Sequence, residues 1–128
     1  MRILLDTHIL LWLVTDSALL SDKVLEIVGN PENICFFSPV SIYEISHKHW
    51  KHPTQMSFNG CEARAVFVDA GFVELQLTSR QMAEADTLEM HHNDPFDRML
   101  LAQAKSEGMM LLSHDRRFSP YGEFVMAV

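Results

Sequence analysis

The chain has 128 residues and a mass of 14.7 kDa, so we expect a single domain over residues 1–128. Apolar residues make up 48% and charged residues 21%, which excludes a disordered, fibrous or disulfide-rich chain. The net charge of −7 argues against nucleic-acid binding through a broad basic face, although phosphate binding through metal ions stays open.

The elements of the N-terminal half follow from apolar runs and helix caps. A buried strand is predicted over Arg2–Leu5, followed by an apolar helix over Thr7–Val14. An amphipathic helix is predicted at 21–28 and a short strand over Ile34–Phe37. The Ser38-Pro39 pair then starts a helix that we expect to reach about Trp50, because serine caps helices and proline suits their first turn.

The C-terminal half continues the alternation of helices and strands. Helices are predicted at 61–70, at 78–88 from a capping-box pattern, and from Asp94-Pro95 to Gly108. Residues 91–93 form a loop, and strands are predicted at 72–75, 109–112 and 124–127. This order indicates an α/β fold with a mainly parallel sheet of four to five strands joined by crossover helices.

The most apolar N-terminal segment, residues 3–14, is too short to span a bilayer, is interrupted by Asp6 and His8, and precedes no cleavage pattern. The cysteines, Cys35 and Cys61, lack metal-binding spacing and fit reduced thiols. We therefore expect a cytoplasmic protein without membrane association.

Two acidic residues follow predicted strands, at the carboxyl ends where parallel α/β sheets usually have their functional sites. Asp6 follows the first strand directly, and Asp115 lies three residues beyond the fourth. Each also has a plainer explanation, since Asp6 suits a helix cap and Asp115 a turn. Asp97 is harder to explain, because it belongs to a helix face that is otherwise apolar, and an unpaired buried carboxylate is costly. The rest of that face consists of Leu100, Leu101, Ala104 and Gly108.

Other polar residues are less distinctive. Glu44 has Lys48 four residues on, so a solvated ion pair explains it. His47, His49 and His52 do not share one helical face, which argues against a zinc site. His92, next to Asp94, suits a local role near a helix start. The sequence contains no phosphate-binding loop (GxxxxGKS/T), no dinucleotide-binding motif (GxGxxG), no α/β-hydrolase nucleophile motif (GxSxG) and no zincin motif (HExxH).

Four segments resemble the PIN domain, specifically its VapC-type toxin branch. They are LLDTH at 4–8, SIYEI at 41–45, HNDPFDR at 92–98 and LLSHDRRF at 111–118. Two positions depart from the usual pattern: Ser113 stands where relatives often have threonine, and Tyr43 where many have tryptophan. The hydroxyl and the aromatic ring are retained, so neither change weakens the resemblance.

The resemblance implies a three-layer α/β/α fold and a metal-dependent endoribonuclease, the toxin of a toxin–antitoxin pair. It implies an RNA substrate, a cognate antitoxin and a homodimer. It assigns both catalysis and metal binding to Asp6, Glu44, Asp97 and Asp115. Further residues, supporting these acids or touching the substrate, are Asp94, Ser113, Arg98, Arg116 and His92.

Physical chemistry supports this assignment. Carboxylates ~5 Å apart repel by ~3 kcal/mol per pair at an effective dielectric near 20, so four in one pocket need cations or protons. Oxygen ligands favour Mg²⁺ or Mn²⁺ over zinc. Water activated by such an ion would cut a phosphodiester to leave a 5′-phosphate and a 3′-hydroxyl.

Two alternatives remain open. A phospho-receiver domain has a similar length and acids at strand ends, but it needs an Asp after the middle strand and a late lysine. Here 72–75 is followed by Gln-Leu-Thr, and no lysine follows Lys105. The second alternative is a catalytically silent PIN-fold binding module, against which the four acids argue.

Overall fold

The computed structural model describes all residues from 1 to 128. Five strands form one sheet in which every neighbouring pair is parallel. Their spatial order is β3 (Val73–Glu74), β2 (Ile34–Phe37), β1 (Arg2–Leu5), β4 (Met110–Ser113) and β5 (Val125–Ala127). The chain leaves the central strand β1 toward β2 and later returns to its other side at β4, so the strand order reverses beside β1. Ligands of open parallel sheets bind at the carboxyl ends of the strands at such a reversal.

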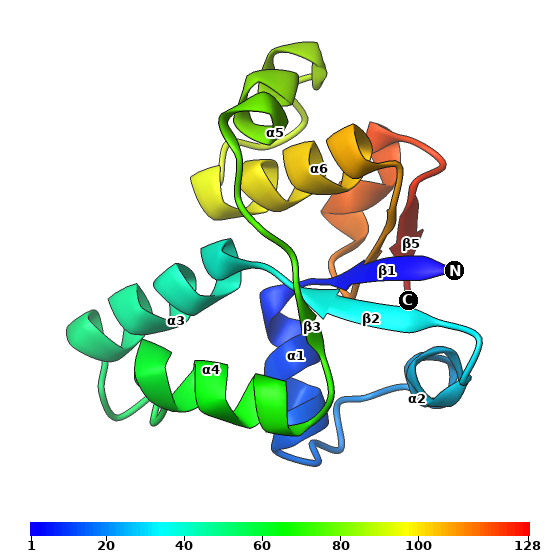
Figure 1. Cartoon of the computed structure of the whole chain (residues 1–128). Helices are drawn as coiled ribbons and strands as arrows, with labels where there is room; N and C mark the ends of the chain where they lie inside the picture. Colours follow the sequence, from blue (N-terminus) through cyan, green and yellow to red (C-terminus); the bar gives the residue numbers. More distant parts are fainter.

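Helices cover both faces of this sheet, as expected for three layers (Figure 1). One face carries α1 and α2, with α4 below α3, while α5 and α6 lie on the other (Figure 1). Helix bounds are α1 Thr7–Val14, α2 Asp22–Gly29, α3 Pro39–Lys51, α4 Gly60–Asp69, α5 Ser79–Ala83 and α6 Pro95–Glu107. Two 3₁₀ helices complete the fold, η1 (Glu84–Thr87) and η2 (Arg116–Tyr121). No helix combines the length and apolar character that crossing a bilayer requires.

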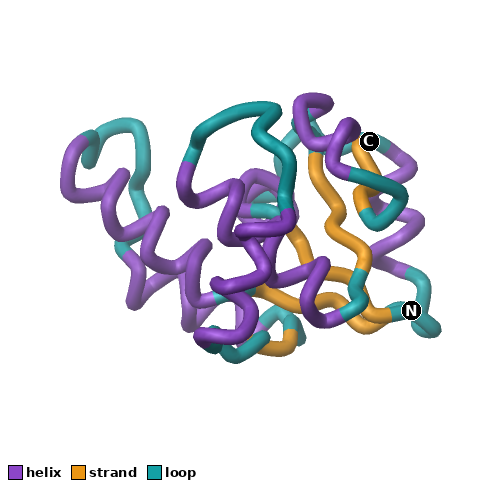
Figure 2. The backbone as a smooth tube through the Cα atoms, turned by 90° about the horizontal axis from the view of Figure 1, so that it is seen from above, coloured by secondary structure: helices purple, strands orange, loops and turns teal.

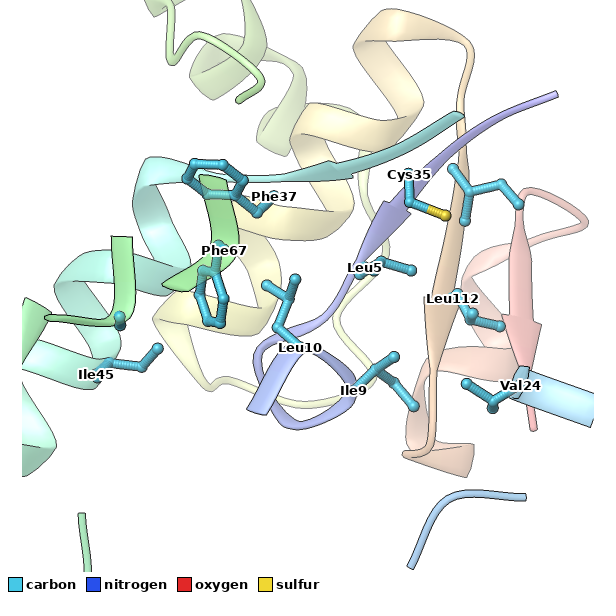
Figure 3. Packing of buried hydrophobic residues seen from close by; sticks show 11 residues of the cluster. Leu5, Ile9, Leu10, Val24, Cys35, Phe37, Ile45, Phe67 and Leu112 are labelled. Atoms are coloured by element: carbon cyan, nitrogen blue, oxygen red, sulfur yellow. The ribbon is translucent and has the colours of Figure 1, made fainter. Parts of the chain in front are cut away.

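The strands have apolar side chains on both faces, as strands buried between two helix layers require. Ile3 and Leu5 point into the cluster under α1 and α4, which includes Phe37 and Phe67 (Figure 3). Leu4 points into the opposite cluster, against α6 and η2. Side chains alternate between the two faces of a strand, so the apolar run at 3–5 serves both cores.

The predicted caps form as the sequence indicated. Ser38 accepts a hydrogen bond from the Val40 amide, and Thr78 forms a capping box with Gln81. Asp94 accepts from the amides of the first turn of α6. Gly108 ends that helix at φ 63°, in the left-handed region that glycine adopts without strain.

Two predictions need correction. The helix predicted at 78–88 ends at Ala83 and continues as η1, whose last residue, Thr87, donates its hydroxyl to the Glu84 carbonyl. Asp86 and Thr87 are poor helix formers, which favours the tighter turn there. The 3₁₀ helix η2 was not predicted, because it shows no helical periodicity and contains Pro120.

The carboxyl ends of the strands point toward one end of the molecule. There α3 and α4 pack side by side and extend beyond the sheet. Seen from above, helices at one side reach well past the strands (Figure 2). The loops after β1 and β4 and the starts of α3 and α6 therefore meet at this end, where the acidic residues lie.

Candidate active site

Four carboxylates from distant parts of the chain line one cavity of about 210 Å³. Asp6 follows β1, Glu44 lies on α3, Asp97 is in the first turn of α6, and Asp115 follows β4. Asp94, the cap of α6, lines the same cavity. The strand reversal beside β1 brings these segments together, because it places the ends of β1 and β4 next to each other.

Asp6 is both a helix cap and a wall of the cavity. One carboxylate oxygen accepts a hydrogen bond from the Ile9 amide at 2.8 Å, and the other accepts from the Ser113 hydroxyl. Ser113 in turn accepts from the Asp115 amide at 3.0 Å, which ties the end of β4 to Asp6. Burial raises the pKa of Asp6, while these donors partly oppose the rise.

Glu44 is buried, so although the i,i+4 contact with Lys48 suggested by the sequence forms, its carboxylate is not solvated. Its side chain is held from α1, because the Thr7 hydroxyl lies 2.7 Å from Oε1 and 2.9 Å from the Ser41 hydroxyl. Lys48 stands 3.9 Å from Oε2, at the limit of an ion pair. Burial raises the pKa of Glu44 despite Thr7 and Lys48.

Asp97 lies at the polar end of an apolar helix face, as predicted. Leu100, Leu101 and Ala104 are buried in the core below it. Burial is the largest cause that raises the pKa of Asp97 to about 7, followed by the charges of Asp94, Glu44, Asp115 and Asp6. The cavity therefore holds more negative charge than its own cationic side chains neutralise.

Asp115 is the acid with a full cationic partner. The Arg117 guanidinium donates to both carboxylate oxygens, from Nε at 2.9 and 3.1 Å and from Nη2 at 2.6 Å. These bonds lower the pKa of Asp115 and raise that of Arg117. Arg117 also approaches Asp97 to 4.0 Å, so it is the nearest positive charge to two acids of the cavity.

His92 supports Asp97 from a half-buried position. Its Nε2 lies 3.1 Å from Asp97 Oδ2, and its Nδ1 lies 3.0 Å from the Tyr121 hydroxyl. Burial, followed by the charge of Arg117, lowers the pKa of His92, so the ring is neutral near pH 7. If Nε2 carries the proton, the ring donates to Asp97 and accepts from Tyr121, which fixes the position of the carboxylate.

The other predicted residues take three different positions relative to the cavity. Asp94 and Ser113 support the site as described above. Arg116 lines a second hollow that shares Asp6 and Asp115 with the cavity. Arg98, predicted either to support the acids or to touch the substrate, does not line the cavity: its guanidinium donates to the carbonyls of Ala85, Leu88 and Glu89 and to Tyr121. It holds the segment before α6.

Sequence reasoning missed several members of the cavity. Arg117 was passed over for its neighbour Arg116, although the side chain two residues after a capping Asp can reach back to it. Thr7, which does not line the cavity but contacts Glu44, was treated only as the start of α1. His8 and His47 also line the cavity, and no periodicity or spacing marked them.

The donor set suits a hard divalent cation. Five carboxylates line the cavity, and carboxylate oxygens are the ligands that such ions prefer; three of the five have raised pKa values, chiefly because they are buried. In the present arrangement no three acidic, histidine or cysteine side chains are grouped closely enough to hold one ion. Asp115 is held by Arg117 and Asp97 by His92, so binding of a metal ion requires these two contacts to break or rearrange.

The raised pKa of Asp97 predicts how pH affects the metal-free protein. The pKa is about 7 in the folded chain and near 3.8 when unfolded, so the folded state binds more protons between these values. The contribution of Asp97 to the free energy of unfolding is fully present below about pH 4, and it is lost as pH rises through about 7. Replacing Asp97 by Asn should therefore stabilise the chain at pH 8 by about 1–2 kcal/mol, discounted for its partial exposure.

Urea unfolding in EDTA at pH 5 and pH 8 measures this effect. The advantage of D97N over the parent chain should grow with pH, and D86N, at an exposed acid on η1, should show no such growth. An advantage that is equal at both pH values would contradict the assigned pKa.

Comparison with known proteins gives one family and several related structures. A family model described as the PIN domain matches residues 3–123. A search of curated protein sequences returned no significant match.

Solved structures share the fold over nearly the whole chain. A chain of VapBC2 from Rickettsia felis, bound to a DNA fragment from its promoter, superposes with a TM-score of 0.71 at 12% identity, covering 100% of this chain and 98% of that one. DNA-bound VapBC from Salmonella typhimurium superposes with a TM-score of 0.70 at 14% identity, covering 99% of this chain and 98% of that one. A toxin–antitoxin complex from Klebsiella pneumoniae superposes with a TM-score of 0.62 at 17% identity, covering 97% of this chain and 95% of that one. At these identities the likeness establishes the fold.

Proposed function

The chain belongs to the PIN domain family, and from that premise we propose that it is a metal-dependent endoribonuclease and the toxin of a toxin–antitoxin pair. The observation that carries the proposal is the convergence of Asp6, Glu44, Asp97 and Asp115 on one cavity. Family membership also removes the phospho-receiver alternative, whose fold is a different one. The silent PIN-fold module is left as the competing hypothesis, and it differs in having no cleavage activity.

The four acids are proposed to hold Mg²⁺ or Mn²⁺. When bound, such an ion neutralises charge on a substrate phosphate and makes water a stronger nucleophile. The chain's own groups set the ligands in place: Ser113 orients Asp6, Thr7 orients Glu44, and His92 orients Asp97. Residues that hold a ligand in this way fix its position, and their loss typically costs about tenfold to a hundredfold in metal affinity or activity.

The remaining cationic side chains suit contacts to the RNA backbone. Arg116 lies in the hollow next to Asp6 and Asp115, and Lys48 lies in the wall of the cavity on the other side. Arg116 is exposed, and Lys48 is half-buried with only a long contact of 3.9 Å to Glu44, so both can meet a phosphate. We assign both to substrate binding and neither to the chemical step.

The toxin assignment rests on the family and on the fold. The solved structures that match this chain over most of its length are two DNA-bound VapBC structures and a toxin–antitoxin complex. We propose that this chain likewise binds an antitoxin, and that it forms a homodimer.

Labelled RNA incubated with the purified chain tests the function. Cleavage in Mg²⁺ should leave 5′-phosphate and 3′-hydroxyl ends, because water is the attacking group. It should stop in EDTA and return when Mg²⁺ is restored. Cleavage that continues in EDTA would contradict the metal mechanism, and no cleavage under any condition would favour the silent module.

Arg117 gives a more specific prediction about metal binding. Since it competes for Asp115, replacing it by Gln should tighten Mn²⁺ binding about two- to fivefold, the range expected for an exposed ion pair. Isothermal titration measures the affinity. R116Q is the matched control, because Arg116 forms no such pair with an acid, and its affinity should stay near that of the parent. Weaker binding by R117Q would show that Arg117 supports the site.

A further inference from the structure

Exposed aromatic rings lie in a row on α3, beside the cavity. Tyr43 and Trp50 are 64% and 77% exposed, the highest values among the phenylalanine, tyrosine and tryptophan side chains. His47 lies between them, 6.3 Å from each ring, and stacks on Tyr43 at 26°. Phe96, from the start of α6, lies 6.0 Å from Tyr43 and 6.1 Å from His47. We call these four residues the aromatic shelf.

Helical spacing produces the shelf. Residues 43, 47 and 50 are separated by one turn each and therefore share a face of α3. The opposite face carries Ser41 and Ile45 into the interior. Because the core already has its own residues, packing does not account for Tyr43 and Trp50 being large and aromatic.

The shelf is continuous with the carboxylate cavity. His47 and Phe96 line the cavity together with Glu44 and Asp97, and Tyr43 and Trp50 extend outward from them. Whatever is held at the carboxylates therefore reaches the shelf without crossing other structure. Lys48 lies in the cavity wall next to His47, and Lys51 is exposed at the end of the same helix.

We propose that the aromatic shelf binds unpaired bases of single-stranded RNA that flank the phosphodiester at the carboxylates. This inference rests on the proposed nuclease function and assigns the side chains that contact the substrate beside the carboxylates. Aromatic side chains stack on bases of any identity, and nearby cations hold the backbone. In a duplex the faces of the bases are covered by their neighbours, so only unpaired bases can stack on the shelf.

A second protein chain fits the shelf less well. Tyr43 and Trp50 each offer at most about 150–250 Å², whereas a stable protein interface takes about 800 Å² from each partner. The half-buried His47 and Phe96 add little to this area. A row of rings roughly 6 Å apart that ends at a carboxylate cavity matches the repeat of an extended nucleotide strand better than a broad apolar interface.

Binding is measured apart from cleavage. A fluorescent 12-nucleotide RNA is titrated with the full chain in EDTA at low salt, as a single strand and as a duplex, and anisotropy gives the dissociation constants. The parent chain should prefer the single strand. W50A and Y43A should weaken single-strand binding about tenfold to a hundredfold, the range for loss of one stacked base. W50F should retain most of the affinity, and L25A, at an exposed apolar residue on α2, should retain all of it.

The outcomes separate this inference from the proposed function. Single-strand binding that depends on the shelf, in a chain that never cleaves RNA, would support the inference while the nuclease proposal fails. Cleavage of single-stranded RNA with the same KM in W50A, Y43A and the parent chain would overturn the inference and leave the nuclease intact. Equal affinity for duplex and single strand, or no binding of either, would also overturn it. So would a shift from dimer to monomer in W50A with unchanged RNA affinity, since the shelf would then join two copies.

Discussion

Replacing Asp6 by Asn is expected to lower the rate of RNA cleavage in Mg²⁺ by about a thousandfold or more. The change removes one of the five carboxylates that line the cavity, and with it the second oxygen of a proposed ligand. Loss of a single charged group at the centre of an active site commonly costs a factor of this order, about 4 kcal/mol in the barrier. The rate is measured with labelled RNA under single-turnover conditions.

The fold should survive this substitution, so the loss of rate can be assigned to the site. The introduced asparagine keeps one oxygen that can accept from the Ile9 amide, which preserves the cap of α1. The contact from the Ser113 hydroxyl is the bond at risk, and its loss is worth about 1 kcal/mol. Thermal unfolding in EDTA checks that the variant is folded.

Asp86 provides the matched control for the same chemical change. It is an exposed acid on η1 and does not line the cavity. D86N should cleave RNA at the parent rate. If D6N also kept the parent rate, the four carboxylates would not be the catalytic centre, and the cleavage would have to be assigned to another site or to a contaminant.

Most of the architecture could be predicted because it depends on local signals. The strand 2–5 is an almost uninterrupted apolar run, and Asp94-Pro95 and Ser38-Pro39 start their helices as such pairs usually do. The weak points were segments without such a signal. The helix predicted at 78–88 became two short turns, and η2 follows no helical period.

Site residues were predictable where position along the chain had a physical consequence. Asp6 and Asp115 could be selected because they follow strands, and Asp97 because an acid on an apolar face needs a partner. Glu44 came only from the family resemblance, since Lys48 explained it more simply. What buries Glu44 is its contact with Thr7, 37 positions away, and no local pattern carries that information.

The choice between Arg116 and Arg117 shows the same limit on a smaller scale. The two residues are neighbours with the same charge, and only the path of η2 decides which one faces Asp115. Arg117 turns back to the carboxylate from the first turn, while Arg116 lies in the adjacent hollow. A prediction that fixes elements to within two residues cannot distinguish them.

Replacing Gln103 by Leu should lower the free energy of unfolding by about 3 kcal/mol. Gln103 is fully buried in α6, where its Oε1 accepts from the Ser38 hydroxyl and its Nε2 donates to Gln81 Oε1 at 3.1 Å. Leucine has a similar volume but can form neither bond. The Ser38 hydroxyl would then be buried without an acceptor, which costs about 1–3 kcal/mol, and the bond to Gln81 would be lost as well.

Gln76, an exposed glutamine, provides the matched control, and Q76L should change stability by less than about 0.5 kcal/mol. Urea unfolding in EDTA measures both variants. The contact has a functional side, because Ser38 caps the helix that carries Glu44 while Gln103 lies on the helix that carries Asp97. Q103L should therefore also weaken Mn²⁺ binding in the fraction that stays folded, since the two helices lose a fixed link. If Q103L were as stable as Q76L, this buried polar contact would not hold the two helices together, and their relative position would have to depend on apolar packing alone.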